Sequence, residues 1–87
     1  SQRESNVFYF KCTDGNIVKK PKEDTMDIAT NMLIQRIVYE LDSTDATLQE
    51  CVNENFKEYE RVYGETILET ATRLEAEEQE KESYKSI

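Results

Sequence analysis

The second half of the chain carries an apolar stripe with helical spacing. Its members recur every three or four residues without an intervening proline: Leu48, Val52, Phe56, Tyr59, Tyr63, Ile67, Ala71 and Leu74. This period predicts one long amphipathic helix over residues 45–79, about 50 Å in length at about 1.5 Å per residue. Because such a helix cannot bury its apolar face against itself, another surface has to cover it.

A single glycine lies within the predicted long helix. Glycine in a helix interior costs about 1 kcal/mol relative to alanine. We expect Gly64 to be tolerated or to allow a close helix crossing, and a kink or hinge is the alternative. The stripe has an average spacing of about 3.7 residues, longer than the roughly 3.5 residues of a left-handed coiled coil. An antiparallel helix pair, or a bundle completed by a partner, therefore fits the pattern better.

A shorter helix is predicted over residues 25–41. Asp24 or Thr25 can cap its N-terminus, and the polar run after Leu41 ends the pattern. Its apolar residues cover more than half of the circumference, so this helix is expected to be buried and contacted from two or more directions. They are Met26, Ile28, Ala29, Met32, Leu33, Ile34, Ile37, Val38 and Leu41.

Residues 7–20 are predicted to form a β-hairpin. Two runs rich in aromatic and β-branched residues flank an Asp-Gly dipeptide, which is typical of type I′ turns. A two-residue loop would place Cys12 opposite Ile17, on the same face as Phe8 and Phe10. That face can cover the first helix. Both strand edges are expected to be unpaired, so a partner or a second copy could add a strand.

Together these elements predict an α+β fold that is mainly α. It consists of an N-terminal β-hairpin, one buried helix and one long amphipathic helix with an acidic, frayed C-terminal end. Residues 80–87 are expected to form a flexible tail. The 87 residues fit a single small domain, 1–87, and the absence of an initial methionine suggests a segment of a larger protein. A domain of this size buries only about 60–65 % of its unfolded surface, so its stability is marginal.

The charge of the chain is distributed unevenly. The net charge is −8, with 37 % hydrophobic and 34 % charged residues. Residues 1–27 are neutral overall, whereas residues 28–87 carry six basic and fourteen acidic residues. A surface of this sign repels nucleic-acid phosphates and acidic membranes, so direct nucleic-acid binding is disfavoured. No apolar run is long enough to predict a membrane span.

Residues that usually carry catalysis or bind metals are scarce. The chain has no histidine, and its two glycines cannot build a phosphate-binding loop. The acidic residues between positions 42 and 50 lack the pattern of a calcium loop, and the other glutamates are most simply a solvated helix face. We therefore expect no enzymatic activity, no cofactor and no metal site.

The two cysteines leave two alternatives for the cellular environment. Reduced thiols at Cys12 and Cys51 would suit an intracellular protein, either cytoplasmic or nuclear. One disulfide joining the hairpin to the long helix would instead indicate an oxidising compartment. The chain has no Asn-x-Ser/Thr acceptor for glycosylation, which favours the intracellular alternative over a secreted protein.

The sequence predicts a non-enzymatic protein–protein interaction and oligomerisation module. Its apolar helix faces would be buried in a homo-oligomer or a multi-subunit complex, where each large side chain contributes about 1.5–3 kcal/mol. The alternative is an acidic inhibitor or decoy that binds the basic, nucleic-acid-binding surface of a partner protein. High salt would dissociate only the second kind of complex. The expected interface residues are Leu48, Val52, Phe56, Tyr59, Tyr63, Ile67 and Leu74 from the long helix, with Phe8 and Phe10 from the hairpin.

Overall fold

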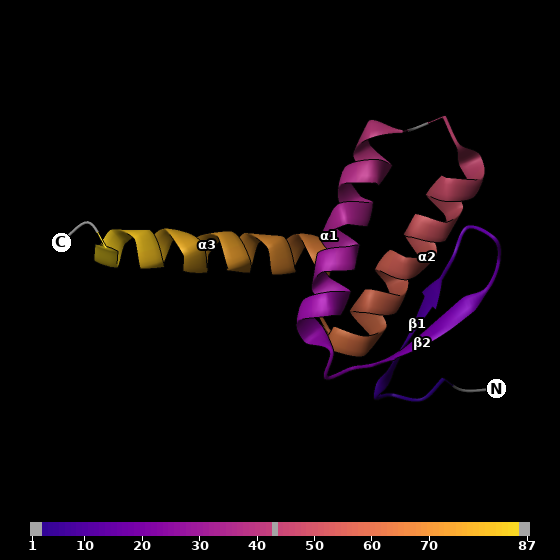
Figure 1. The fold of residues 1–87 in the computed structure, drawn as a ribbon, viewed down its shortest axis with the longest axis horizontal. Helices are drawn as coiled ribbons and strands as arrows, with labels where there is room; N and C mark the ends of the chain where they lie inside the picture. Colours follow the sequence, from indigo (N-terminus) through magenta and orange to yellow (C-terminus); the bar gives the residue numbers. More distant parts are fainter. Residues whose placement is uncertain (1–2, 43, 86–87) are drawn as a thin grey trace.

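A two-stranded antiparallel hairpin followed by three helices makes up the fold (Figure 1). The computed structural model describes residues 3–42 and 44–85. The strands are β1 (Val7–Lys11) and β2 (Ile17–Pro21), and the helices are α1 (Thr25–Leu41), α2 (Ala46–Tyr63) and α3 (Ile67–Lys85). The predicted α+β class, mainly α with an N-terminal hairpin, is confirmed.

The hairpin forms where it is predicted, but its register differs by one residue. Ile17 pairs with Lys11 instead of Cys12. The loop has three residues, because the Cys12 N–H donates to the Asn16 carbonyl at 2.9 Å. Within the loop, the Gly15 N–H donates to the Cys12 carbonyl at 3.0 Å, and Gly15 adopts a φ of 92°. This is a turn followed by a bulged glycine, not the predicted type I′ turn. The extra residue moves Ile17 to the sheet face opposite Phe8, where it is exposed.

Helix α1 spans the predicted residues and is covered on one side only. Ile28, Ala29 and Met32 are buried against the rest of the chain. Met26 and Leu41, near the two ends of the helix, are among its most exposed residues. The contacts expected from several directions are therefore not all made within this chain.

The predicted single long helix is in fact two helices. Helix α2 ends at Tyr63, and Gly64 adopts the left-handed conformation at φ 70°, with its N–H donating to the Glu60 carbonyl at 2.9 Å. Glycine favours this position because the conformation is strained for residues that carry a Cβ. Thr66 and Glu69 then start α3 as a capping box: the Glu69 carboxylate accepts the Thr66 N–H, and the Thr66 hydroxyl accepts the Glu69 N–H.

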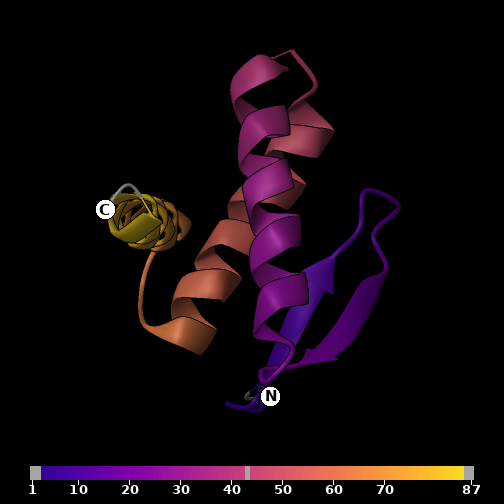
Figure 2. The same cartoon turned by 60° about the vertical axis from the view of Figure 1, so that its left-hand side comes forward.

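Helix α3 runs away from the body formed by the hairpin, α1 and α2 (Figures 1 and 2). Only its beginning is held, since Ile67 and Thr70 are buried while residues 72–82 are exposed. Residues 80–87 were predicted to form a flexible tail, but α3 continues through this segment to Lys85. Residues 86–87 lie outside the described part of the chain.

The core lies where β1 and the three helices meet. The ring of Phe8 packs edge-on against that of Tyr59, with 6.5 Å between the ring centroids. The Tyr59 hydroxyl shares a hydrogen bond of 2.8 Å with the hydroxyl of Thr70, which ties α2 to α3. The buried cluster consists of Phe8, Ile28, Met32, Tyr59, Val62 and Ile67.

Helix α2 covers the outer edge of β1 with polar side chains in place of a third strand. The Asn55 side chain accepts the Lys11 N–H at 2.8 Å and donates to the Lys11 carbonyl at 3.0 Å. One helical turn later, the Glu58 carboxylate accepts the Tyr9 N–H at 2.7 Å. Asn55 and Glu58 are both buried, so these hydrogen bonds are shielded from water.

Arg61 completes this contact, which we call the β1–α2 seam and define by Asn55, Glu58, Arg61 and the β1 backbone. The Arg61 guanidinium donates to the Val7 carbonyl at 2.7 Å and to both Glu58 oxygens at 2.7 and 2.9 Å. The prediction of two unpaired strand edges is therefore wrong for β1. Buried backbone groups that would otherwise lack partners are satisfied by α2.

Replacing Gly64 with alanine should destabilise the chain by about 1 kcal/mol, because a Cβ is strained in the left-handed conformation. Gly64→Asn is the matched control and should lose less stability, since asparagine tolerates this conformation better. Urea unfolding midpoints of the three proteins measure the order. A Gly64→Ala variant as stable as the natural chain would contradict the role assigned to Gly64 at the end of α2.

Replacing Asn55 with alanine should lower the free energy of unfolding by about 2–3 kcal/mol, because the Lys11 N–H and carbonyl lose their partner. Asn53 is exposed on the same helix, so Asn53→Ala is the matched control and should change stability by less than about 0.5 kcal/mol. Urea denaturation followed by circular dichroism measures both. Equal losses would contradict the role assigned to Asn55 in the seam.

Candidate interaction surface

Glu58 is the buried carboxylate among the described residues, and a buried carboxylate is a candidate for acid–base catalysis. Its burial alone would raise its pKa. Hydrogen bonds from Arg61 and from the Tyr9 N–H, together with the charges of Arg61 and Arg3, outweigh the burial and hold the pKa of Glu58 below its ordinary value. Because these oxygens are committed to partners within the chain, Glu58 serves the β1–α2 seam and not a substrate.

Other features that point to chemistry are limited within residues 3–42 and 44–85. No group of three or more Cys, Asp or Glu side chains in these ranges could hold a metal ion. No helix in the same ranges has the length and apolar character needed to cross a bilayer. The thiols of Cys12 and Cys51 are both free in the structure.

Most of the interface residues predicted from the sequence are packed within the chain. Phe8, Val52, Tyr59 and Ile67 are buried, Leu48, Phe10, Phe56 and Tyr63 are half-buried, and Leu74 is exposed. The helix break at Gly64 explains this outcome. It lets the hairpin and α1 cover the α2 part of the stripe, and it turns the first residues of α3 back into the core.

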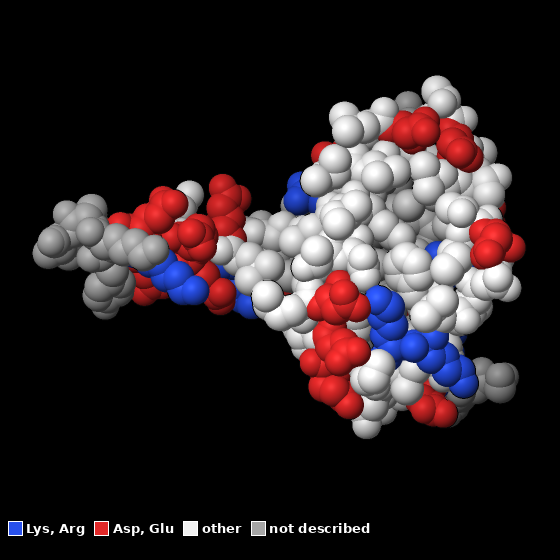
Figure 3. Space-filling model, in the orientation of Figure 1, with Lys and Arg blue, Asp and Glu red and all other residues white. Residues whose placement is uncertain are grey.

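The structure instead exposes an apolar strip on α1, which we call the α1 face. It consists of Met26, Ile34, Ile37 and Leu41, whose exposed fractions lie between 54 % and 83 %. At 100° per residue these four side chains fall within an arc of about 80°, which also contains Thr30 and no charged residue. Figure 3 shows that the surface over α1 and α2 is largely free of charge, with charged groups above and below it.

An apolar groove lies between α1, α2 and α3, and none of the α1-face residues lines it. It has a volume of about 490 Å³. The rings of Tyr39 and Phe56, with centroids 5.6 Å apart, and the buried side chain of Ile67 contribute to its lining. Arg36, Glu40, Lys57 and Glu60 also line it, so charges of both signs border an apolar interior. Such a site suits an apolar anchor flanked by polar contacts.

The sequence predicts that the apolar faces of the first helix are buried against a partner, but none of the interface residues it names comes from α1. Apolar residues over more than half of a helix circumference predict burial on several sides. An 87-residue chain with one hairpin and two further helices has too few elements to cover all sides of α1. A short chain with so broad an apolar helix face cannot cover all of that face, and this mismatch is the signal that could have indicated an exposed side of α1.

Comparison with known proteins identifies no relative. No protein-family model, no curated protein and no solved structure matches this chain. The features of this chain that bear on function are therefore its own: the α1 face, the groove and the acidic helix α3.

The lowered pKa of Glu58 should make stability depend on pH. A carboxyl whose folded pKa lies below its unfolded value of about 4.3 contributes stability that is present above that value and lost as pH falls through the folded pKa. The free energy of unfolding should therefore decrease as pH is lowered from about 6 to below about 4, and Glu58→Gln should reduce this decrease.

Glu54→Gln is the matched control for this titration. Glu54 also has a lowered pKa, caused first by its hydrogen bond with Lys11, but its carboxylate is exposed and solvent screens the pair. The control should keep most of the pH dependence. Urea unfolding at several pH values measures each slope, and identical slopes for Glu58→Gln and the natural chain would contradict the assignment.

Proposed function

We propose that this chain is a non-enzymatic protein-interaction module that assembles into a homo-oligomer or a multi-subunit complex through the α1 face. The observation that carries this proposal is a charge-free strip of four large, exposed apolar side chains on one helix. Single exposed apolar residues are common on monomers, whereas contiguous apolar patches with polar rims are typical of protein contacts. Burying each large side chain contributes about 1.5–3 kcal/mol before the cost of association.

The arrangement of the α1 face favours a second copy of the chain as the partner. Met26 and Leu41 lie near the two ends of α1, and Ile34 and Ile37 lie between them. In an antiparallel helix pair with two-fold symmetry, Met26 of one copy would lie opposite Leu41 of the other, with the Ile34 side chains near the axis. This pairing buries apolar residues on both sides without burying a charge.

Helix α3 supplies additional apolar surface that a partner could cover. Leu68 and Leu74 are exposed, and Leu68 also lines the groove. Beyond its first residues α3 has few contacts with the rest of the chain, and a solitary helix of this length is only marginally stable in water. Contacts made by an assembled partner would therefore also stabilise α3.

Sedimentation equilibrium over a range of protein concentrations tests the homo-oligomer. We expect the average mass to rise above that of the monomer and the association to persist at about 1 M salt. The double substitution Ile37→Ser with Leu41→Ser should weaken association by at least about 100-fold, since two apolar contacts of about 1.5 kcal/mol each are lost.

Ile17→Ser is the matched control for these substitutions. Ile17 is an exposed isoleucine on the hairpin and lies outside the α1 face, so its replacement should leave the association constant unchanged. Equal weakening by the control, or a monomer at every concentration, would overturn assembly between copies through the α1 face. Circular dichroism of each variant verifies that the fold is retained.

The second candidate function is an acidic inhibitor or decoy that binds a basic surface of a partner protein. The observation that favours it is the exposed acidic surface of α3, where basic groups are fewer (Figure 3). Its exposed glutamates are Glu69, Glu75, Glu77, Glu78, Glu80 and Glu82. A complex formed this way would dissociate at about 1 M salt, where the Debye length is about 3 Å, so the same salt series separates the two functions.

A further inference from the structure

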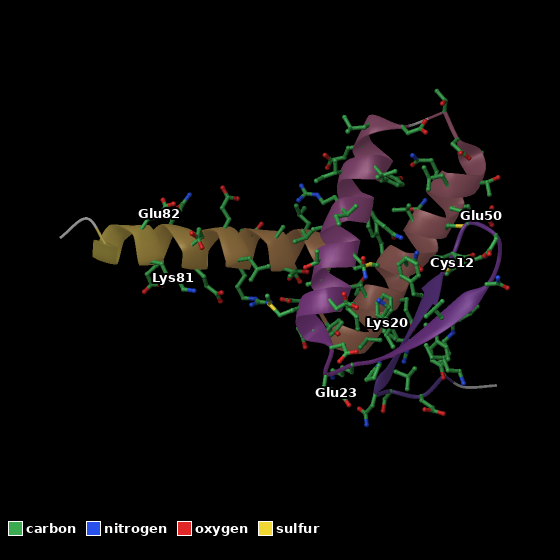
Figure 4. All side chains as sticks on the ribbon, in the orientation of Figure 1. Cys12, Lys20, Glu23, Glu50, Lys81 and Glu82 are labelled. Carbon is green, nitrogen blue, oxygen red and sulfur yellow. The ribbon has the colours of Figure 1, made fainter. Side chains whose placement is uncertain are left out.

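Two cysteines that are distant in the sequence meet at one end of the β1–α2 seam. The Cys51 sulfur, in the first turns of α2, lies 3.7 Å from the carbonyl oxygen of Cys12, the residue that follows β1. Cys51 is buried and Cys12 is half-buried. Figure 4 shows Cys12 at the end of the hairpin that lies beside the beginning of α2, near Glu50.

The seam holds this approach in place. Asn55 is one helical turn after Cys51, and the residue it binds through two hydrogen bonds, Lys11, directly precedes Cys12. Standard bond lengths place the Cys51 sulfur within about 6 Å of the Cys12 Cα. Disulfide geometry requires Cα atoms about 4.4–6.8 Å apart, and from this contact it is reached by side-chain rotation together with movement of the hairpin end toward α2.

We propose that Cys12 and Cys51 are a redox-responsive pair that forms an intrachain disulfide by exchange with a low-molecular-weight disulfide such as glutathione disulfide. The more exposed thiol, Cys12, loses its proton to solvent and attacks one sulfur of glutathione disulfide. A mixed disulfide on Cys12 forms and one glutathione thiolate leaves.

The second step closes the protein disulfide. The Cys51 thiol loses its proton, and the resulting thiolate attacks the Cys12 sulfur of the mixed disulfide. The Cys12–Cys51 bond forms as the second glutathione thiolate leaves, and solvent protons convert both leaving groups to thiols. One protein dithiol is oxidised and one glutathione disulfide is reduced to two glutathione molecules.

This bond would fasten the hairpin to α2 just beyond the three side chains of the seam. It closes a loop of about 40 residues in the unfolded chain, and restricting a loop of that size should lower the equilibrium constant for unfolding by about 10²- to 10³-fold. The α1 face does not include either cysteine, so the proposal is independent of the proposed function.

The test uses the reduced full chain, incubated with glutathione disulfide at neutral pH, acid-quenched and then alkylated in denaturant. We expect the main product to have lost two hydrogen atoms, to carry no glutathione and no alkyl group, and to unfold at a higher urea concentration. Cys51→Ser should stop at the mixed disulfide on Cys12. Cys12→Ser should react much more slowly than Cys51→Ser, because Cys51 is buried.

Three outcomes would overturn the proposal. The first is a mixed disulfide that persists on the natural chain, and the second is a disulfide between two chains as the main product. The third is an intrachain disulfide that forms in urea but not in the folded chain, because the fold would then not bring the two sulfurs together. Circular dichroism of the Cys12→Ser and Cys51→Ser variants verifies that each remains folded during the reaction.

Discussion

The fold depends on the hydrogen bonds by which α2 covers the edge of β1. Two isolated strands are only marginally stable in water, and an uncovered outer edge of β1 would leave backbone groups without partners beside the core. Helix α2 advances about 4.5 Å over three residues, whereas two residues of β1 advance about 6.6 Å. The distance between helix and strand contacts therefore grows along the seam, and the side chains lengthen to match it. Asn55 reaches Lys11, the longer Glu58 reaches Tyr9, and the longest, Arg61, reaches Val7.

This seam determines how the remaining elements are arranged. With β1 held along α2, Phe8 packs into the core against Tyr59, and α1 closes the core from one side. The break at Gly64 then brings Ile67 and Thr70 back to Tyr59, so the chain covers most of its own α2 stripe. What stays outside is the opposite side of α1 and nearly all of α3. The proposed interaction surface is thus what remains after a small chain has completed its core.

Several charged groups also contribute to the fold, through hydrogen bonds that join its elements. The buried Glu58 carboxylate forms an ion pair with the more exposed Arg61, whose hydrogen bonds extend to the β1 backbone. Beyond the helix break, Glu65 accepts hydrogen bonds from Arg73 and Thr70, which lower its pKa and tie the start of α3 to the turn. Helix α3 exposes six glutamates and carries three basic residues, whereas the α1 face carries no charge.

The sequence by itself determined the local elements: hydrophobic period and capping residues predicted α1 from 25 to 41, and the Asp-Gly turn predicted the hairpin. At Gly64 the sequence predicts a tolerated glycine or a close crossing, with a kink as the alternative, and the Thr66–Glu69 capping box that starts α3 is missed. Only the tertiary structure decided that the helix does end there, since the packing of Ile67 and Thr70 makes the turn more favourable than a continuous helix. The hairpin register and the exposed side of α1 were decided in the same way. Local patterns show which faces are apolar, but which of these faces becomes buried depends on which elements of the rest of the chain can pack against it.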